Sequence, residues 1–289
     1  MWIQLLTGIL LIAAFFLLVI IIDGNRFVIK EYQLSDTKLK KEVTYVLLAD
    51  LHDKDYGSGN RKLRRAIKKI NPDGILVAGD MVSANKGEDY STALSLLLEL
   101  SKAYPIYYGN GNHESKIERY PGIYGNAGCS YQTYKNSLIK AGVHFLLNDH
   151  IYLPAANIDI YGLETKGEYY QRFFTYPMKE NFLKQNLGTP NHNHTNILIA
   201  HNPEYFKDYG RWGADLVVSG HIHGGMMRLP LLGGVISPKV RLFPKYDGGI
   251  FKEKGTTMII SRGIGDHWPN IRIFNPAELV VIRLSPGNQ

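Results

Sequence analysis

Apolar runs of strand length alternate with helix-like stretches in the first half of this 289-residue chain. Strand-forming runs are predicted at residues 43–50, 74–80 and 105–114. A basic amphipathic helix over residues 61–70 and an apolar helix over residues 90–103 separate them. Alternation of strand, helix and strand implies right-handed crossovers, so this half is expected to form a mostly parallel sheet.

The apolar runs come closer together in the second half. After a predicted helix at residues 131–142, two runs at residues 143–149 and 158–164 indicate antiparallel pairing. Later strands are predicted within residues 195–204, 214–225, 256–265 and 277–284. The pattern as a whole predicts a large α/β domain, with 45% hydrophobic residues to fill its core.

The first 22 residues differ from the rest because they carry no charged side chain. An α-helix needs about 20 apolar residues to cross a bilayer. A cleaved signal peptide is the alternative, but the basic start and the small-residue cleavage site of such a peptide are missing. We therefore expect a single-pass transmembrane anchor at residues 1–22, a polar tether at residues 23–42 and the globular domain at residues 43–286.

Charge indicates how the anchor is oriented. Basic residues follow the apolar segment and none precedes it: Arg26, Lys30, Lys38, Lys40 and Lys41. The positive-inside rule then places the domain in the cytoplasm, at the cell membrane. A net charge of +7 suits a protein beside an anionic leaflet. The basic helix at residues 61–70 is best interpreted as a solvated surface, and no aromatic-basic groove indicates nucleic-acid binding.

Polar side chains follow five of the predicted strands directly. They are Asp50 and His52, Asp80, Asn112 and His113, His201, and the pair His221 and His223. Asp and Asn often end strands as turn formers, which would explain one such case but not five. With a single cysteine, Cys129, a multi-cysteine zinc site is excluded. Carboxylate, amide and imidazole ligands suit Mn²⁺, Fe or Zn²⁺, and the set is large enough for two ions that share a carboxylate.

The histidine pair lies in the segment SGHIHGG, residues 219–225, after a short apolar strand. Side chains at positions i and i+2 of an extended segment lie on one face. His221 and His223 are therefore expected to project together from the carboxyl end of that strand, where open α/β sheets bind ligands.

These motifs resemble the calcineurin-like metallophosphoesterase superfamily. Its blocks occur here in order as DLH, GD, GNHE, AHNPE and GHIH, between about Val43 and Leu284. Within the superfamily, the segments SGHIHGG, FPKYDGGIF and SRGIGDHWPNIRIFNPAEL are similar to the membrane-associated branch typified by the bacterial YkuE and YaeI phosphodiesterases. The resemblance implies a four-layer sandwich in which two mixed β-sheets are flanked by helices.

The resemblance also implies roles for the motif residues. Asp50, His52 and His223 would bind one metal ion, Asn112, His201 and His221 a second, and Asp80 would bridge the two. His113 would face the substrate as the catalytic residue. The family reaction is the hydrolysis of a phosphodiester or pyrophosphate bond by in-line attack of a metal-bridging hydroxide, with Mn²⁺ the favoured metal.

One departure from the family pattern concerns His113. Many relatives have an aspartate three residues after the bridging one, and this chain has Ser83 there, which leaves Glu114 as the nearest carboxylate in sequence. The anchor favours a lipid-linked phosphoester substrate, such as a UDP-diacylglucosamine-like pyrophosphate. A membrane-tethered metal-binding scaffold without activity and a nuclease remain the alternatives.

Overall fold

The computed structural model describes residues 1–289 except 125–129, 172–173, 230–231, 238–240, 267–269 and 288–289. Two six-stranded mixed sheets form the centre of the domain. The first has the order β1-β14-β2-β3-β4-β5. Its strands are β1 Phe27–Asp36, β14 Ala277–Pro286, β2 Val43–Leu48, β3 Gly74–Ala78, β4 Ile106–Gly109 and β5 His144–Phe145. Strands β2 to β5 run parallel, as the alternation of elements predicts.

The second sheet has the order β12-β13-β9-β8-β7-β6. Its strands are β12 Gly249–Glu253, β13 Thr256–Ile260, β9 Leu216–Ser219, β8 Thr195–Ile199, β7 Ile158–Gly162 and β6 Asp149–Leu153. The pair β6 and β7 is antiparallel, as expected, and β7, β8 and β9 run parallel. A small hairpin of β10 Arg228–Leu229 and β11 Gly233–Gly234 stands apart from both sheets.

Three apolar clusters hold the layers together. Between the two sheets, fully buried side chains such as Leu76, Ile160 and Val218 interdigitate. Helices α2 Arg61–Ile70, α3 Ser91–Ser101 and α5 Tyr131–Lys140 cover the outer face of the first sheet, and α6 Phe182–Leu187 and α7 Phe206–Trp212 cover that of the second. The helix–sheet–sheet–helix arrangement confirms the expected fold class.

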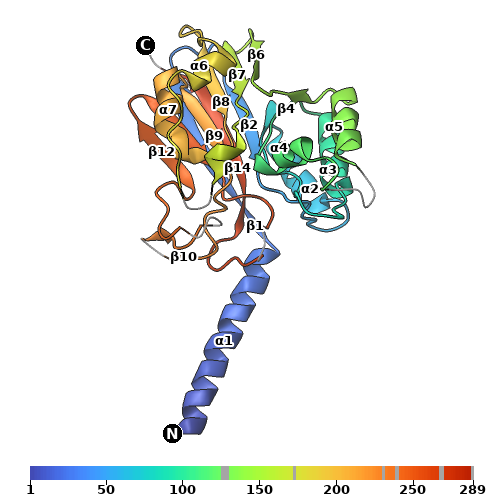
Figure 1. Cartoon of the computed structure of the whole chain (residues 1–289), viewed down its shortest axis with the longest axis vertical. Coiled ribbons are helices and arrows are strands. Elements are labelled where there is room, and N and C mark those ends of the chain that lie inside the picture. Colours follow the sequence, from blue (N-terminus) through green and yellow to red (C-terminus); the bar gives the residue numbers. More distant parts are fainter. Residues whose placement is uncertain (125–129, 172–173, 230–231, 238–240, 267–269, 288–289) are drawn as a thin grey trace.

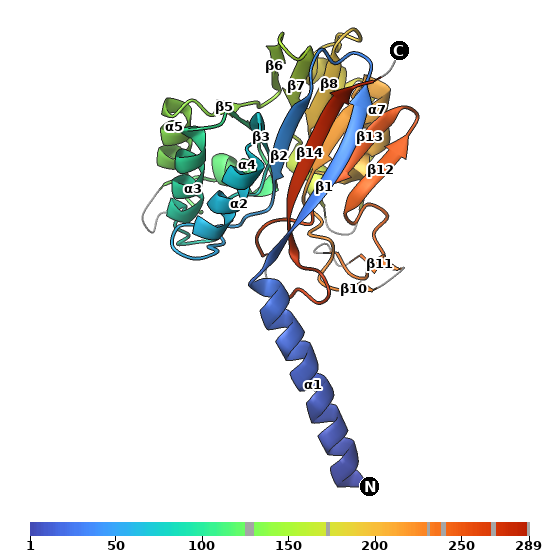
Figure 2. The ribbon, with the colours of Figure 1, turned by 180° about the vertical axis from the view of Figure 1, so that it is seen from behind.

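The apolar N-terminal segment forms helix α1 Trp2–Gly24, which extends away from the domain (Figures 1 and 2). It is long and apolar enough to cross a membrane, and none of its most apolar window is buried in the protein. Only Asn25 and Arg26 separate α1 from β1.

Residues 23–42 are predicted to form a polar tether, but part of this segment is a strand in the structure. Residues 27–36 form strand β1, which pairs in parallel with β14 over ten residues. The segment looks polar in sequence because β1 is an edge strand, and the side chains of Lys30 and Glu31 are exposed. Its inward side chains Tyr32 and Leu34 pack against the core between the sheets, so β1 is an integral part of the domain.

Candidate metal centre

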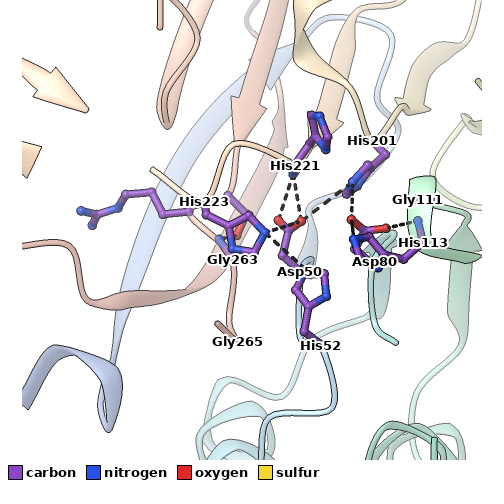
Figure 3. A network of polar contacts seen from close by, with 12 residues as sticks. Asp50, His52, Asp80, Gly111, His113, His201, His221, His223, Gly263 and Gly265 are labelled. Carbon is purple, nitrogen blue, oxygen red and sulfur yellow. Dashed lines mark hydrogen bonds and ion pairs between the residues drawn. The ribbon is translucent and has the colours of Figure 1, made fainter. Parts of the chain in front are cut away.

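The predicted ligands meet where five parallel strands end. Asp50 and His52 follow β2, Asp80 follows β3, and Asn112 and His113 begin helix α4 Asn112–Arg119 after β4. From the second sheet, His201 follows β8, while His221 and His223 follow β9. Because the two sheets pack face to face with these ends at one side, the aspartate and histidine side chains converge into one network (Figure 3).

One half of the network contains Asp50, His52 and His223. Their ligand atoms lie within 4.8 Å of one another. The Nε2 atoms of the two histidines are 3.3 Å apart, and His223 Nε2 lies 3.4 Å from Asp50 Oδ1. Ser83 Oγ lies 2.9 Å from His52 Nδ1, which leaves His52 Nε2 directed into the cluster. These are the three residues that the resemblance assigns to the first metal.

The other half contains Asp80, His201 and His221, whose ligand atoms are also within 4.8 Å of one another. His201 Nε2 is 3.0 Å from Asp80 Oδ2 and 3.9 Å from Asp50 Oδ1. The His201 ring donates through Nδ1 to the Ala78 carbonyl at 2.6 Å, which fixes Nε2 as the nitrogen that faces the carboxylates. Asp80 also groups with His52 and His113, so it lies between the two halves.

The backbone around these ligands is strained. Asp50, His52, Asp80, His221 and His223 all adopt positive φ angles, between 48° and 73°. Such angles are uncommon outside glycine and cluster at functional sites, because the surrounding structure must compensate for their cost. The turns re-aim each side chain toward a common point.

The extended geometry expected for SGHIHGG is therefore wrong beyond Ser219. His221 and His223 lie in a turn, and they contribute to different halves of the network rather than to one face of a strand. Gly220 makes this possible, because a Cβ at that position would overlap the Asp50 carboxylate. The His221 amide instead donates to both Asp50 oxygens, at 3.0 and 3.1 Å.

His113 lies beside the network, with Nε2 4.0 Å from Asp80 Oδ2. The Ala84 amide donates to His113 Nδ1 at 2.8 Å. This contact orients the ring with the opposite polarity to a carboxylate at position 83, because Nδ1 accepts the hydrogen bond and the proton is left on Nε2. Ser83 contacts His52 instead, at 2.9 Å from Nδ1, so serine in place of aspartate affects the support of a predicted metal ligand rather than that of His113.

Glu114 does not orient His113. Its carboxylate accepts hydrogen bonds from the backbone amides of Asp80, Met81 and Gly111 at 2.8–2.9 Å and from the Tyr108 hydroxyl at 2.9 Å. The side chain is fully buried. Glu114 therefore holds the loop after β3 against the start of α4, which sets the relative positions of Asp80 and His113.

The two buried aspartates differ in their electrostatics. Burial raises the pKa of Asp50 to about 7, with the His201 imidazole lowering it and the Asp80 carboxylate raising it. Burial also opposes ionisation of Asp80, but the surrounding imidazoles of His201, His113 and His52 outweigh it and hold the pKa of Asp80 well below its usual range. Asp80 is thus the carboxylate that stays ionised, as a bridging ligand must.

The donor set fits divalent cations. Four imidazoles and two carboxylates gather in the two halves of the network. Asn112 Oδ1 is buried and has no hydrogen-bond partner among the described residues. A buried carbonyl oxygen without a donor is costly unless a cation or water takes that place. Its position beside His113 at the start of α4 agrees with the predicted role of Asn112 as a ligand.

A pocket of about 900 Å³ opens over the centre. His52, Asn112, His113 and His221 line it, and so do Arg119 and Tyr120. Glu168, Tyr170, Asp266 and Asn270 line it as well. The volume suits a ligand larger than a single phosphate group.

Comparison with known families settles which group of proteins shares this centre. Residues 43–225 match the family model of the calcineurin-like phosphoesterases. The chain belongs to the calcineurin-like phosphoesterase family. The matched segment contains every strand end that supplies a predicted ligand.

Several members of the family are similar over most of this chain. The metallophosphoesterase Cj0846 of Campylobacter jejuni is 29% identical over 262 residues, which cover 89% of this chain and 63% of the relative. The UDP-2,3-diacylglucosamine pyrophosphatase LpxG of Chlamydia muridarum is 24% identical over 77% of each chain. YkuE of Bacillus subtilis is 25% identical over 84% of this chain and 79% of its own. The chain spans just under two thirds of the length of the first relatives that it matches.

Among solved structures, the phosphopantetheinyl hydrolase of Mycobacterium tuberculosis is similar with a TM-score of 0.45. It is 14% identical and the match covers 79% of this chain and 91% of that structure.

Two features of the site are absent from the sequence prediction. Ala84 acts through its backbone amide, which no side-chain motif can reveal. Lys116 and Arg119 line the pocket from α4. Their spacing from Asn112, at i+4 and i+7, is that of one helix face, and this periodicity is the signal that would have found them.

Proposed function

We propose that this protein is a membrane-anchored phosphoesterase that depends on two divalent metal ions and hydrolyses phosphodiester or pyrophosphate bonds, with a lipid-linked substrate. The observation that carries the proposal is the pair of adjacent ligand clusters with Asp80 between them. Family membership supports the reaction class, and the similarity to LpxG, a pyrophosphatase of UDP-2,3-diacylglucosamine by name, supports a lipid-linked pyrophosphate.

The residues would divide the work as follows. Asp50, His52 and His223 would hold one ion, and Asn112, His201 and His221 the other, with Asp80 shared. Bound divalent ions lower the pKa of a water and neutralise charge that develops on phosphoryl oxygens. Mn²⁺ is the favoured ion, and Fe and Zn²⁺ suit the same ligands.

His113 would act on the substrate. The Ala84 amide occupies its Nδ1, so the proton resides on Nε2, which faces the pocket. From there it can donate a hydrogen bond to a phosphoryl oxygen or a proton to the leaving oxygen. Arg119 and Lys116 supply positive charge in the pocket wall for a second phosphate or a carboxylate of the substrate.

Helix α1 would hold the domain at the bilayer, with the domain in the cytoplasm. Tethering an enzyme and a lipid-linked substrate to the same surface raises their effective concentration. This advantage applies only to substrates that stay in the membrane. It would explain why a hydrolase carries a membrane anchor.

The test uses the full chain in detergent and in lipid vesicles. Activity on an aryl phosphodiester, an aryl phosphomonoester and a diacylglycerol-linked pyrophosphate is measured with Mn²⁺, Zn²⁺, Fe²⁺ or no metal. We expect metal-dependent diester and pyrophosphate hydrolysis that Asp80→Asn abolishes and His113→Ala lowers by about 10²–10⁴-fold.

The matched control is His144→Ala, which removes an exposed histidine in β5 far from the centre. It should leave activity unchanged. Tight metal binding without turnover of any of the three substrates would favour the scaffold alternative. Activity that survives Asp80→Asn would reject the site.

A further inference from the structure

The β10–β11 region and the loop before β14 lie at the end of the domain from which α1 leaves (Figures 1 and 2). Six large apolar side chains in the loops there are exposed. They belong to the β10–β11 hairpin, the segment that follows it and the loop before β14. These residues, called the apolar rim below, are Leu229, Leu232, Leu242, Phe243, Ile271 and Phe274. Leu232 and Leu242 are 63% and 67% exposed, which is unfavourable for a surface that faces only water.

Backbone hydrogen bonds join these loops into one surface. The Arg228 amide donates to the Ile273 carbonyl at 3.0 Å, and the Ile273 amide donates to Met226 at 3.1 Å. The Phe243 amide donates to Val235 at 2.9 Å. These hydrogen bonds connect the hairpin to the loop that precedes β14 and to the segment around Phe243.

The contacts of Phe274 show where the apolar rim lies along helix α1. Its ring centroid is 6.3 Å from that of Phe15 and 6.4 Å from that of Phe16, both in α1. Phe16 precedes Asp23 by seven residues, a rise of about 10 Å along the helix. The Phe274 ring thus reaches past the end of α1 and packs against a part of the helix that lies within its apolar segment.

The neighbouring residue, Asn275, holds the loop of Phe274 against the end of α1. The Asn275 amide donates to the Asp23 carboxylate at 3.0 Å, where Asp23 is only 3% exposed and also pairs with Arg26. Asn275 Nδ2 donates to the carbonyls of His223 and Gly225 at 2.7 and 2.6 Å. A short chain of contacts therefore runs from the end of α1 to a predicted metal ligand.

We propose that the apolar rim inserts into the membrane interface beside α1, so that the bilayer itself is the partner of this surface. The proposal rests on the proposed anchoring by α1. If α1 crosses the bilayer, Phe274 cannot contact Phe15 and Phe16 without entering it. Amphipathic elements of this kind bury their apolar side chains about 5–10 Å into the headgroup region.

Insertion of the apolar rim would also bring the pocket close to the membrane surface. Asp266 and Asn270, from the same loop as Ile271 and Phe274, line the pocket over the metal centre. The pocket therefore shares a wall with the membrane-inserted loop. A lipid-linked phosphoester could bring its headgroup to the metal centre while its acyl chains remain in the bilayer.

The test places an environment-sensitive fluorophore at single cysteines in the full chain. The single native cysteine, Cys129, is first replaced by serine. Labels are attached at Phe274→Cys and at Leu232→Cys, which is exposed enough to tolerate the change. Leu10→Cys in α1 serves as the positive control for anchoring, and Ile139→Cys, 50% exposed on α5, as the control for a label in water. Each labelled protein is checked by thermal unfolding before use.

In phosphatidylcholine–phosphatidylglycerol vesicles, nitroxide lipids labelled near the headgroup should quench the labels at 274 and 232 about threefold more than the label at 139. Absence of quenching at both rim positions, with the label at 10 quenched by deeply labelled lipids, would overturn the proposal while the anchor stands. If the label at 10 is also unquenched, the anchoring itself fails. Rim labels that respond to protein density and not to nitroxide lipid would show that a second copy covers the rim, which also overturns the proposal.

Discussion

At the scale of residues, the motif letters predicted which side chains would gather but not how the backbone presents them. The DLH, GD, GNHE, AHNPE and GHIH blocks all lie at strand ends, as expected. The positive φ angles of His221 and His223 could not be read from a two-residue spacing, because that spacing suits an extended strand equally well. The turn is imposed by contacts with Asp50, which is distant in sequence.

Ser83→Ala should weaken metal binding without disturbing His113. The Ser83 hydroxyl lies 2.9 Å from His52 Nδ1, and loss of a partner that orients a metal-binding histidine typically lowers metal affinity about 10–100-fold. Calorimetric titration with Mn²⁺ measures the affinity, and turnover at saturating metal reports on His113. Ser101→Ala, which alters a hydroxyl in α3, is the matched control. Unchanged affinity with reduced turnover would show that Ser83 supports His113 instead.

Metal binding should release protons near neutral pH. Burial lowers the pKa of His201, but the adjacent carboxylates of Asp80 and Asp50 outweigh it and raise the pKa to about 9. Below that pH the ring is protonated before metal binds, and the cation must displace the proton. Apparent affinity should therefore rise with pH up to about 9. Titrations in two buffers of different ionisation enthalpy measure the release, which should shrink above the His201 pKa. Binding heats that are the same in both buffers near neutral pH would contradict this.

At the scale of elements, strands with clear apolar patterns were predictable from the sequence. Strand β1, at the edge of the first sheet, was not. The predicted strands at residues 43–50, 74–80 and 277–284 correspond to β2, β3 and β14. Strand β1 alternates exposed polar side chains with half-buried ones, so its sequence resembles a linker. Its pairing with β14 joins residues about 250 positions apart, and no local pattern encodes such a contact.

Strand β1 should be required for stability even when α1 is removed. A chain that begins at Arg26 keeps the ten-residue ladder with β14, whereas one that begins at Val43 loses it and uncovers the edge of β14. We expect the shorter chain to unfold at least about 10 °C lower or to aggregate, because several kcal/mol of pairing and packing are lost. Thermal unfolding by circular dichroism and size-exclusion chromatography compare the two. Equal melting temperatures would show that β1 is dispensable, as a tether would be.

At the scale of the whole molecule, the connection between helix and domain is short. Only two residues separate α1 from β1, and Asp23 at the end of α1 is bonded to Asn275 near the metal centre. A flexible tether would let the domain sample many heights above a bilayer. If α1 anchors the protein as proposed, this arrangement would hold the pocket at a nearly constant height, which would favour a substrate that is itself confined to the membrane surface.

Orientation in the membrane should depend on the charges that flank α1. Five basic residues lie between Arg26 and Lys41, directly after α1, so the domain should be cytoplasmic. Protease added to sealed inside-out vesicles should then digest the domain, and protease added to right-side-out vesicles should not. Adding a short run of lysines after Met1 removes the charge asymmetry and should produce a mixed population in the same assay. A domain that is digested only in right-side-out vesicles would reverse the assignment. Because the rim and the pocket are fixed to α1, such a result would also move the proposed substrate to the opposite leaflet.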